Sequence, residues 1–309
     1  ALDGGYFFDG PAQKKARESL LENQRKWLDT LAQPLRDAGI SVTTEARWGK
    51  PLYTMILQRI NEINPDLVLR DAHSHGVLQR LFFNNTCWQL IRHCPVPLWL
   101  VRAGEWKGER ICAAVDPTHS SDSTAALDHL IVKSTIALAD LLGMQADYMH
   151  SYAPLPRTMV FDTELVAAYD QYVERSAKHH REAFEKLMVD YPIEKTNRHL
   201  LEGFPEDSIP EFVKEHGIDL LVMGAVSRGN LENALIGNTA ERVLEAVQTD
   251  LLVIKPSGTV RHSTPGVLQR WADFFIFSSY TGASTWICVA LKSLPPLAQP
   301  AVHLTLLSS

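Results

Sequence analysis

A glycine-containing loop in the second half of the chain carries the residues best suited to bind a ligand. The pattern consists of Gly224, Ser227, Arg228, Gly229, Gly237, Asn238 and Thr239. It starts where a predicted strand ends and finishes where a predicted helix begins, which is where open α/β sheets bind ligands. Glycine permits positive φ angles and close approach of a ligand to the backbone. Because the N–H groups of such a turn and of a helix start attract anions, the pattern predicts a phosphate-binding loop.

The same loop has a purely structural interpretation. Asn238 can cap the following helix, and Glu241 stands three residues later, as a capping box requires. Gly224 and Gly229 can simply turn the chain. The residues alone leave both interpretations open.

An internal repeat organises the chain. The stretch 65–71 resembles the stretch 218–224 at an offset of 153 residues, and the same offset relates 98–102 to 251–255. One spacing that is preserved across several elements indicates a duplicated structural unit.

The first copy carries different residues at the two positions that would let this loop bind an anion. Asp71 stands in place of Gly224, and Asn84 stands in place of Gly237. Asp71 would bring a negative charge toward a phosphate, and two flexible positions are lost. We therefore expect that the first copy does not bind a nucleotide.

Short apolar runs alternate with segments of helical periodicity in the second copy. The predicted strands cover 110–116, 146–152, 195–201, 219–224 and 251–255. The predicted helices cover 122–142, 163–190, 205–216 and 238–247. Apolar strands that alternate with helices form a parallel sheet covered on both faces, and right-handed crossovers make it doubly wound. The fold class is therefore α/β, with two tandem doubly wound parallel-sheet domains.

The repeat divides the chain into three predicted regions. Residues 1–104 form a degenerate first domain, truncated at its start because the counterpart of Asp116 would precede residue 1. Residues 109–256 form a complete second domain, and residues 257–309 match nothing in the repeat. This last region is either a small element that packs on the domains or a non-native tail, such as a frameshifted segment. The second interpretation is preferred.

The glycine pattern and the tandem arrangement resemble the universal stress protein family. That family carries, after its fourth strand, Gly, two residues, Gly, nine residues, and then Gly followed by Ser or Thr. Gly224 and Gly237 match the first and last glycines, whereas Ser227 replaces the middle glycine and Asn238 replaces the Ser or Thr. The tandem pair with its degenerate first copy is similar to the subfamily called universal stress protein E.

This resemblance, which covers about residues 1–256, implies a fold, an interface and a ligand. The fold would be the adenine-nucleotide α-hydrolase-like sheet. The last strands of the two copies, 98–102 and 251–255, would meet in a pseudo-dimer within one chain; a homodimer stays open. Members that bind ATP use an acidic residue after the first strand, matched here by Asp116. They also use residues around the signature, matched by Met223, Gly224, Ser227, Gly237, Asn238 and Thr239.

Three functions are compatible with the sequence. The first is a stress-response module that binds ATP or another small ligand in its second domain, linked by the resemblance to resistance to DNA damage in bacteria. The second is an enzyme that slowly hydrolyses the nucleotide it holds, with Arg228 neutralising developing charge. The third is a structural dimerisation protein without a ligand. Because the sequence lacks the nucleophile-elbow, P-loop and zinc-helix motifs, we expect a binding protein and not an enzyme.

Composition limits the partners and the compartment. The 309 residues carry a formal net charge of −6, which argues against a nucleic-acid scaffold. The four cysteines show no metal-ligand spacing, as expected for buried thiols in a reducing cytosol. No secretory signal is visible, and no apolar run reaches the ~20 residues that span a membrane. We expect a cytoplasmic protein with no metal and no membrane or nucleic-acid partner.

Overall fold

The computed structural model describes the chain in eight stretches. These are residues 10–72, 84–102, 106–118, 122–154, 166–225, 236–256, 286–292 and 301–308. They belong to two compact units, Ala1–Arg70 with Ala283–Ser309 and, separately, Asp71–Gly282. The division between the units therefore lies earlier in the chain than the predicted linker between the two copies.

A parallel sheet forms the centre of the second unit. Its strands are β4 (Arg110–Ala114), β5 (Gln145–Tyr152), β6 (Arg198–Glu202), β7 (Leu220–Gly224) and β8 (Asp250–Ile254). They lie in the order β6-β5-β4-β7-β8, and neighbouring strands are parallel. The chain thus builds outward from β4 in both directions, which confirms the predicted doubly wound sheet.

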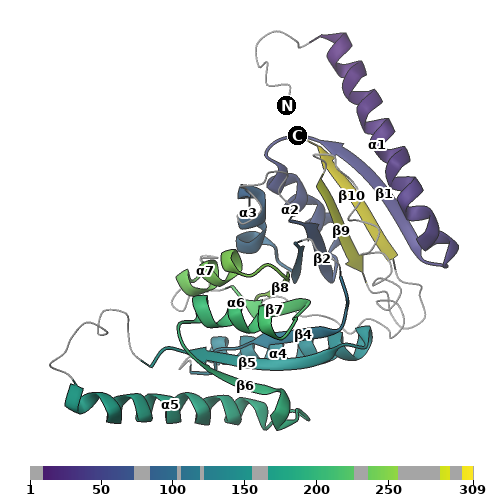
Figure 1. Ribbon diagram of the computed structural model, residues 1–309. Helices are drawn as coiled ribbons and strands as arrows, with labels where there is room; N and C mark the ends of the chain where they lie inside the picture. The colour runs from purple at the N-terminus through teal and green to yellow at the C-terminus, as the bar shows by residue number, and fades with distance from the viewer. Residues whose placement is uncertain are drawn as a thin grey trace. The chain divides into compact units, whose positions relative to one another are not determined.

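Four helices connect these strands. They are α4 (Asp122–Leu142), α5 (Val166–Met188), α6 (Pro205–Glu215) and α7 (Asn238–Ala246), and a short 3-10 helix, η2 (Lys195–Asn197), precedes β6. α4 contacts β4, β5 and β7, while α6 packs beside α7 (Figure 1). Right-handed crossovers place α4 and α5 on one face of the sheet and α6 and α7 on the other. β7 and β8 are buried along almost their whole length, as a sheet covered on both faces requires.

The last helix and strand of the first copy also belong to the second unit. These are α3 (Asn85–His93) and β3 (Leu98–Val101), and β3 pairs antiparallel with β8. The buried Asp250 ties the two strands together, because it accepts hydrogen bonds from Trp99 Nε1 and from the Arg102 N–H, each at 2.9 Å. The predicted meeting of the last strands of the two copies is thus confirmed.

The first unit is a smaller sheet with two helices. Its elements are α1 (Pro11–Asp37), β1 (Ser41–Trp48), α2 (Leu52–Ile63), β2 (Leu67–Asp71), β9 (Trp286–Lys292) and β10 (Ala301–Ser308). α1 packs along β1 and buries Leu28, Ala32 and Leu35. The strand order is β1-β10-β9-β2.

Strands β9 and β10 come from residues 257–309, for which the sequence left two interpretations. β10 pairs parallel with β1, and β9 pairs antiparallel with β2. The repeat equates β1 with β6 and β2 with β7, so β10 and β9 take the positions that β5 and β4 hold in the second unit. This arrangement agrees with an element packed on the fold, although β9 runs opposite to its counterpart.

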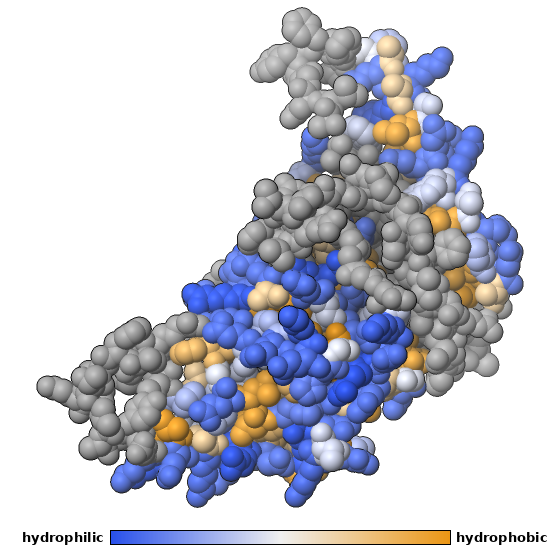
Figure 2. All heavy atoms as spheres, viewed as in Figure 1, coloured by the Kyte–Doolittle hydropathy of each residue, from blue (hydrophilic) through white to orange (hydrophobic). Residues whose placement is uncertain are grey.

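The described residues that Figure 2 shows in colour present a mainly hydrophilic face. In the face that Figure 2 shows, apolar side chains gather in small separate groups among hydrophilic ones. Large apolar side chains that are exposed in the described stretches include Leu20, Trp48, Tyr172 and Val189, which come from different parts of the chain. No described helix combines the length and the apolar character needed to cross a bilayer.

Candidate ligand-binding site

A cavity of about 700 Å³ lies at the carboxyl ends of β4, β5 and β7 in the second unit. The predicted residues that line it are Asp116, Met223, Gly224, Gly237, Asn238 and Thr239. The structure therefore brings together side chains from two loops that are more than a hundred residues apart. The other predicted residues, Ser227, Arg228 and Gly229, lie outside the described residues, so their part in the site stays a prediction.

Two acidic residues are linked at the end of β4. Asp116 follows the strand, and its Oδ1 accepts a hydrogen bond from Thr118 Oγ1 at 2.8 Å. The Asp116 N–H donates to Oδ1 of Asp128 on α4 at 3.0 Å. Burial raises the pKa of Asp128 to about 7; the hydrogen bond from the Asp116 N–H opposes this shift, and the Asp116 charge adds to it. Asp128 is therefore a carboxyl group that changes charge near neutral pH.

Helix α7 begins at the cavity without a side-chain cap. Gly237 is its N-cap residue and Asn238 its first helical residue, so the predicted capping box of Asn238 and Glu241 is wrong. The equivalent helix of the first copy, α3, is capped by Asn84, whose Oδ1 accepts from the Cys87 N–H at 2.9 Å. Glycine has no side chain to accept such a bond, so no N-cap side chain occupies the first-turn N–H groups of α7, and N–H groups at a helix start are suited to bind an anion.

Gly224 ends β7 and faces α4. A Cβ atom at this position would lie 2.8 Å from Leu127 Cδ2 and 3.5 Å from Ile131 Cδ1. A separation of 2.8 Å is shorter than two carbon atoms tolerate in a packed interior. The absence of a side chain at Gly224 therefore lets α4 approach the end of β7 at the cavity wall.

Two histidines form a hydrogen-bonded pair beside the cavity. His150 on β5 is buried, with its Nδ1 3.0 Å from the Val115 carbonyl oxygen and its Nε2 2.8 Å from His180 Nδ1. Because a carbonyl oxygen only accepts, Nδ1 of His150 carries a proton, and a neutral His150 then accepts from His180 Nδ1–H. His180 lines the cavity and stacks on Tyr152, with ring centroids 4.7 Å apart. The pair thus holds the His180 ring in one orientation at the wall.

A positive charge lies where α7 lines the cavity. Arg242 on α7 pairs with Glu206 on α6, with Nη1 3.0 Å from Oε1. The Arg242 side chain is 62% exposed, so the pair contributes little to stability. Its position at the cavity nevertheless places a guanidinium group within reach of a bound anion.

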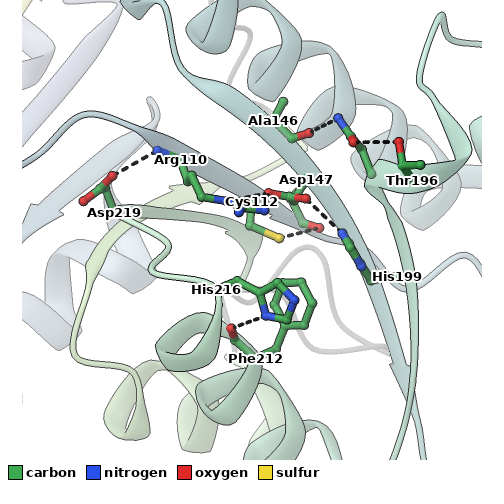
Figure 3. A network of polar contacts seen from close by, with 11 residues as sticks. Arg110, Cys112, Ala146, Asp147, Thr196, His199, Phe212, His216 and Asp219 are labelled. Atoms are coloured by element: carbon green, nitrogen blue, oxygen red, sulfur yellow. Dashed lines mark hydrogen bonds and ion pairs between the residues drawn. The ribbon is translucent and has the colours of Figure 1, made fainter.

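A second polar network lies near the amino ends of the same strands, and its residues do not line the cavity. Asp147 on β5 accepts hydrogen bonds from Arg110 Nη2 at 2.7 Å and from His199 Nε2 at 2.9 Å (Figure 3). Asp219 accepts one from the Arg110 N–H at 3.0 Å. Burial acts to raise the pKa of Asp147, but the hydrogen bonds from His199 and Arg110 outweigh it and lower that pKa. This network joins β4, β5 and β6 and is structural.

Comparison with known proteins decides the family. Residues 5–102 and 108–255 each match the universal stress protein family. The chain belongs to this family. The two matched segments agree with the tandem arrangement, and the cavity lies within the second universal stress protein domain.

Several relatives match over most of this chain and over most of their own length. The chain is 30% identical over 260 residues to universal stress protein E of Salmonella typhi, covering 83% of this chain and 81% of the relative. It is 31% identical over 235 residues to a universal stress protein E homolog of Haemophilus influenzae, covering 75% and 74%. A crystal structure of a putative universal stress protein from Pseudomonas aeruginosa is 27% identical, with a TM-score of 0.62 over 75% of this chain and 78% of that one.

Among the polar residues that the sequence did not single out are Asp128 and His180, which line this universal stress protein cavity, and His150, which bonds to His180 beside it. A signal was present for Asp128, because it lies three residues before Ile131 and seven before Thr135, which are both buried on α4. An acidic residue on the apolar face of a helix is uncommon and indicates a special environment. His150 and His180 had no comparable signal, since their pairing joins a strand to a helix 30 residues away.

No cluster of His, Cys, Asp and Glu suited to a metal ion occurs within the described stretches. The described cysteines Cys87, Cys94 and Cys112 are buried, and burial raises the pKa of Cys94 to about 11. Burial also raises the pKa of Cys112, so the Cys94 and Cys112 thiols are protonated at neutral pH and are poor nucleophiles.

Proposed function

We propose that this protein is a cytoplasmic stress-response protein whose second domain binds ATP or a chemically similar small ligand without turning it over. A role in resistance to DNA-damaging stress is part of the proposal, on the basis of the similarity to universal stress protein E. The first domain, in this proposal, binds no nucleotide and serves the tandem interface through β3.

The observation that carries the proposal is the combination of chemical groups around one cavity. The start of α7 and the Arg242 guanidinium offer N–H donors to an anion. Leu127, Ile131 and Met149 offer an apolar surface to a ring. Asp116 supplies an acceptor for hydroxyl or amino groups. A cavity of about 700 Å³ is within the range of small-molecule sites.

Calorimetric titration of ATP into the full chain tests the proposal. We expect saturable binding with a dissociation constant of about 1–100 μM and one ATP per chain, because only the second copy has a suitable loop. A parallel assay should detect no release of inorganic phosphate. No binding at millimolar ATP would contradict ATP as the ligand. Two ATP molecules per chain would contradict a first copy that binds no nucleotide, and sustained phosphate release would favour the alternative of a nucleotide-hydrolysing enzyme.

A Gly237→Asn variant should weaken ATP binding by about three- to tenfold, since it gives α7 the cap that Asn84 gives α3. The new side chain would accept from a first-turn N–H group that the proposal assigns to the phosphate. The φ angle of −69° at Gly237 accommodates asparagine, so the fold should persist. The measurement is the same calorimetric titration, together with thermal unfolding. ATP affinity equal to that of the unmodified protein would show that the start of α7 does not contact the ligand.

A further inference from the structure

Of the two carboxylate oxygens of Asp128 at the cavity, one accepts a hydrogen bond from the described residues and the other does not. Its Oδ1 accepts the hydrogen bond from the Asp116 N–H at 3.0 Å. Its Oδ2 is buried and has no hydrogen-bond partner within the described part of the chain, and the residue as a whole is only 5% exposed. A buried polar atom without a partner is rare in folded proteins. Because Asp128 lines the cavity, a bound ligand is the natural source of that partner.

The geometry also determines where a proton on Asp128 resides. Oδ1 already accepts from a backbone N–H, so the neutral form carries its proton on Oδ2. Burial holds the pKa of this carboxyl near 7, so both forms are populated around neutral pH. Neutral Asp128 offers an O–H donor to the cavity, whereas ionised Asp128 offers a second negative charge close to Asp116.

The charged groups around Asp128 come from several elements. The titratable or charged residues that line the same cavity are Asp116 after β4, His180 on α5, Glu206 on α6 and Arg242 on α7. On β5, His150 bonds to the Val115 carbonyl, and on α4 itself His129 bonds to Tyr191. β7 contributes Met223 and Gly224, which carry no charge. Of these groups, Asp116 is the one whose charge acts on Asp128 most directly, and it favours the neutral form.

We propose that Asp128 contacts the ligand as a neutral carboxylic acid that donates its Oδ2–H, so that ligand binding takes up a proton. The inference rests on the proposed function, since it concerns the same cavity. An anionic ligand group in the cavity repels an ionised Asp128 beside Asp116, and it therefore favours the protonated form of Asp128. The ligand class that fits is a small molecule with an anionic group for the start of α7 and a hydrogen-bond acceptor for Asp128, as in a nucleotide. Its affinity should rise as the pH falls through 7.

The test is calorimetric titration of ATP at pH 6 and pH 8 into the full chain and two variants. Asp128→Asn keeps an acceptor for the Asp116 N–H and mimics the neutral carboxyl. Asp140→Asn removes an exposed carboxylate from the same helix and serves as the matched control. ATP ionises identically in all three titrations, so differences between the proteins report on the protein alone.

The ratio of ATP affinity at pH 6 to that at pH 8 in Asp128→Asn serves as the reference. Relative to this reference, we expect the unmodified protein and Asp140→Asn to gain about a further tenfold in ATP affinity between pH 8 and pH 6. At pH 8, Asp128→Asn should bind ATP more tightly than the unmodified protein. Repeating the titration in buffers of different ionisation enthalpy should show proton uptake in the unmodified protein and a smaller uptake in Asp128→Asn. Equal pH dependence in all three proteins would overturn the inference.

A second measurement separates this inference from the proposed function. In the ligand-free protein with selectively labelled aspartate, the NMR signal of the Asp116 amide reports on Asp128, because the two are hydrogen-bonded. A titration of that signal with a midpoint near pH 7, lost in Asp128→Asn, supports the protonated Asp128 even if ATP proves to be the wrong ligand. A signal that does not titrate between pH 6 and pH 8 overturns the inference even if ATP binds.

Discussion

A Gly224→Asp variant should lose at least about a hundredfold in ATP affinity, equivalent to roughly 3 kcal/mol. The Cβ atom alone would lie 2.8 Å from Leu127 Cδ2, so the Leu127 side chain or α4 itself must shift at the end of β7. The added carboxylate also brings a negative charge into a cavity that already holds Asp116 and Asp128. Steric displacement and charge repulsion act in the same direction, and the first copy carries the same residue, Asp71, at the equivalent position.

Two further variants separate the causes. Gly224→Ala keeps the steric conflict without the charge, and we expect an intermediate loss of affinity. Gln145→Glu adds one negative charge at the exposed amino end of β5, away from the cavity, and should leave binding unchanged. Calorimetric titration measures affinity, and circular dichroism checks that each variant is folded. Affinity of a folded Gly224→Asp variant within threefold of the unmodified protein would remove Gly224 from the site.

The core of the second domain was predictable because its pattern is local. The strand predicted at 110–116 is β4 at Arg110–Ala114, and the strand predicted at 219–224 is β7 at Leu220–Gly224. A strand covered on both faces must be apolar throughout, so it stands out from the helices that flank it. The exception is the strand predicted at 195–201, whose first three residues form η2 instead.

The details of the site were less predictable because they depend on contacts between distant segments. Asn238 and Glu241 have the spacing of a capping box, yet the helix begins one residue earlier than such a box needs, with Gly237 as the N-cap. Asp128 receives its environment from the Asp116 N–H and from burial under neighbouring elements, neither of which appears in local spacing. The position of Gly237 at the carboxyl edge of the sheet followed from the fold class, because the loop joins the end of a strand to the start of a helix. The part of Asp116 in the site was expected from the resemblance to the family.

The pairing of the strands at the end of the chain could not be predicted from the sequence, for a different reason. Ala301 in β10 lies opposite Ser41 in β1, and Leu291 in β9 lies opposite Leu67 in β2. The apolar character of residues 286–292 is compatible with a strand, but alternation cannot say which distant strand it joins. The repeat was also uninformative, since residues 257–309 have no counterpart in it.

An Asp147→Ala variant should lower the free energy of unfolding by about 3–5 kcal/mol at pH 7. The carboxylate is buried and accepts from both Arg110 and His199, so its removal leaves the guanidinium and the imidazole without their acceptor (Figure 3). Breaking one side of a buried ion pair costs more than the pair contributes, because the remaining charge stays desolvated. The network joins β4, β5 and β6, so the loss should destabilise the whole second unit.

The lowered pKa of Asp147 determines how this loss of stability depends on pH. The pKa of Asp147 is lowered in the folded protein, so its contribution is present above the unfolded pKa and is lost as the pH falls through the folded value. The stability gap between the unmodified protein and Asp147→Ala should therefore be full at pH 7 and narrow toward pH 3. Glu185→Ala is the matched control, because Glu185 is a half-exposed partner of Arg198 at 2.7 Å and its loss should cost less than about 1 kcal/mol. Urea unfolding at several pH values measures all three proteins. A similar, pH-independent loss in both variants would show that Asp147 acts by packing and not through its charge.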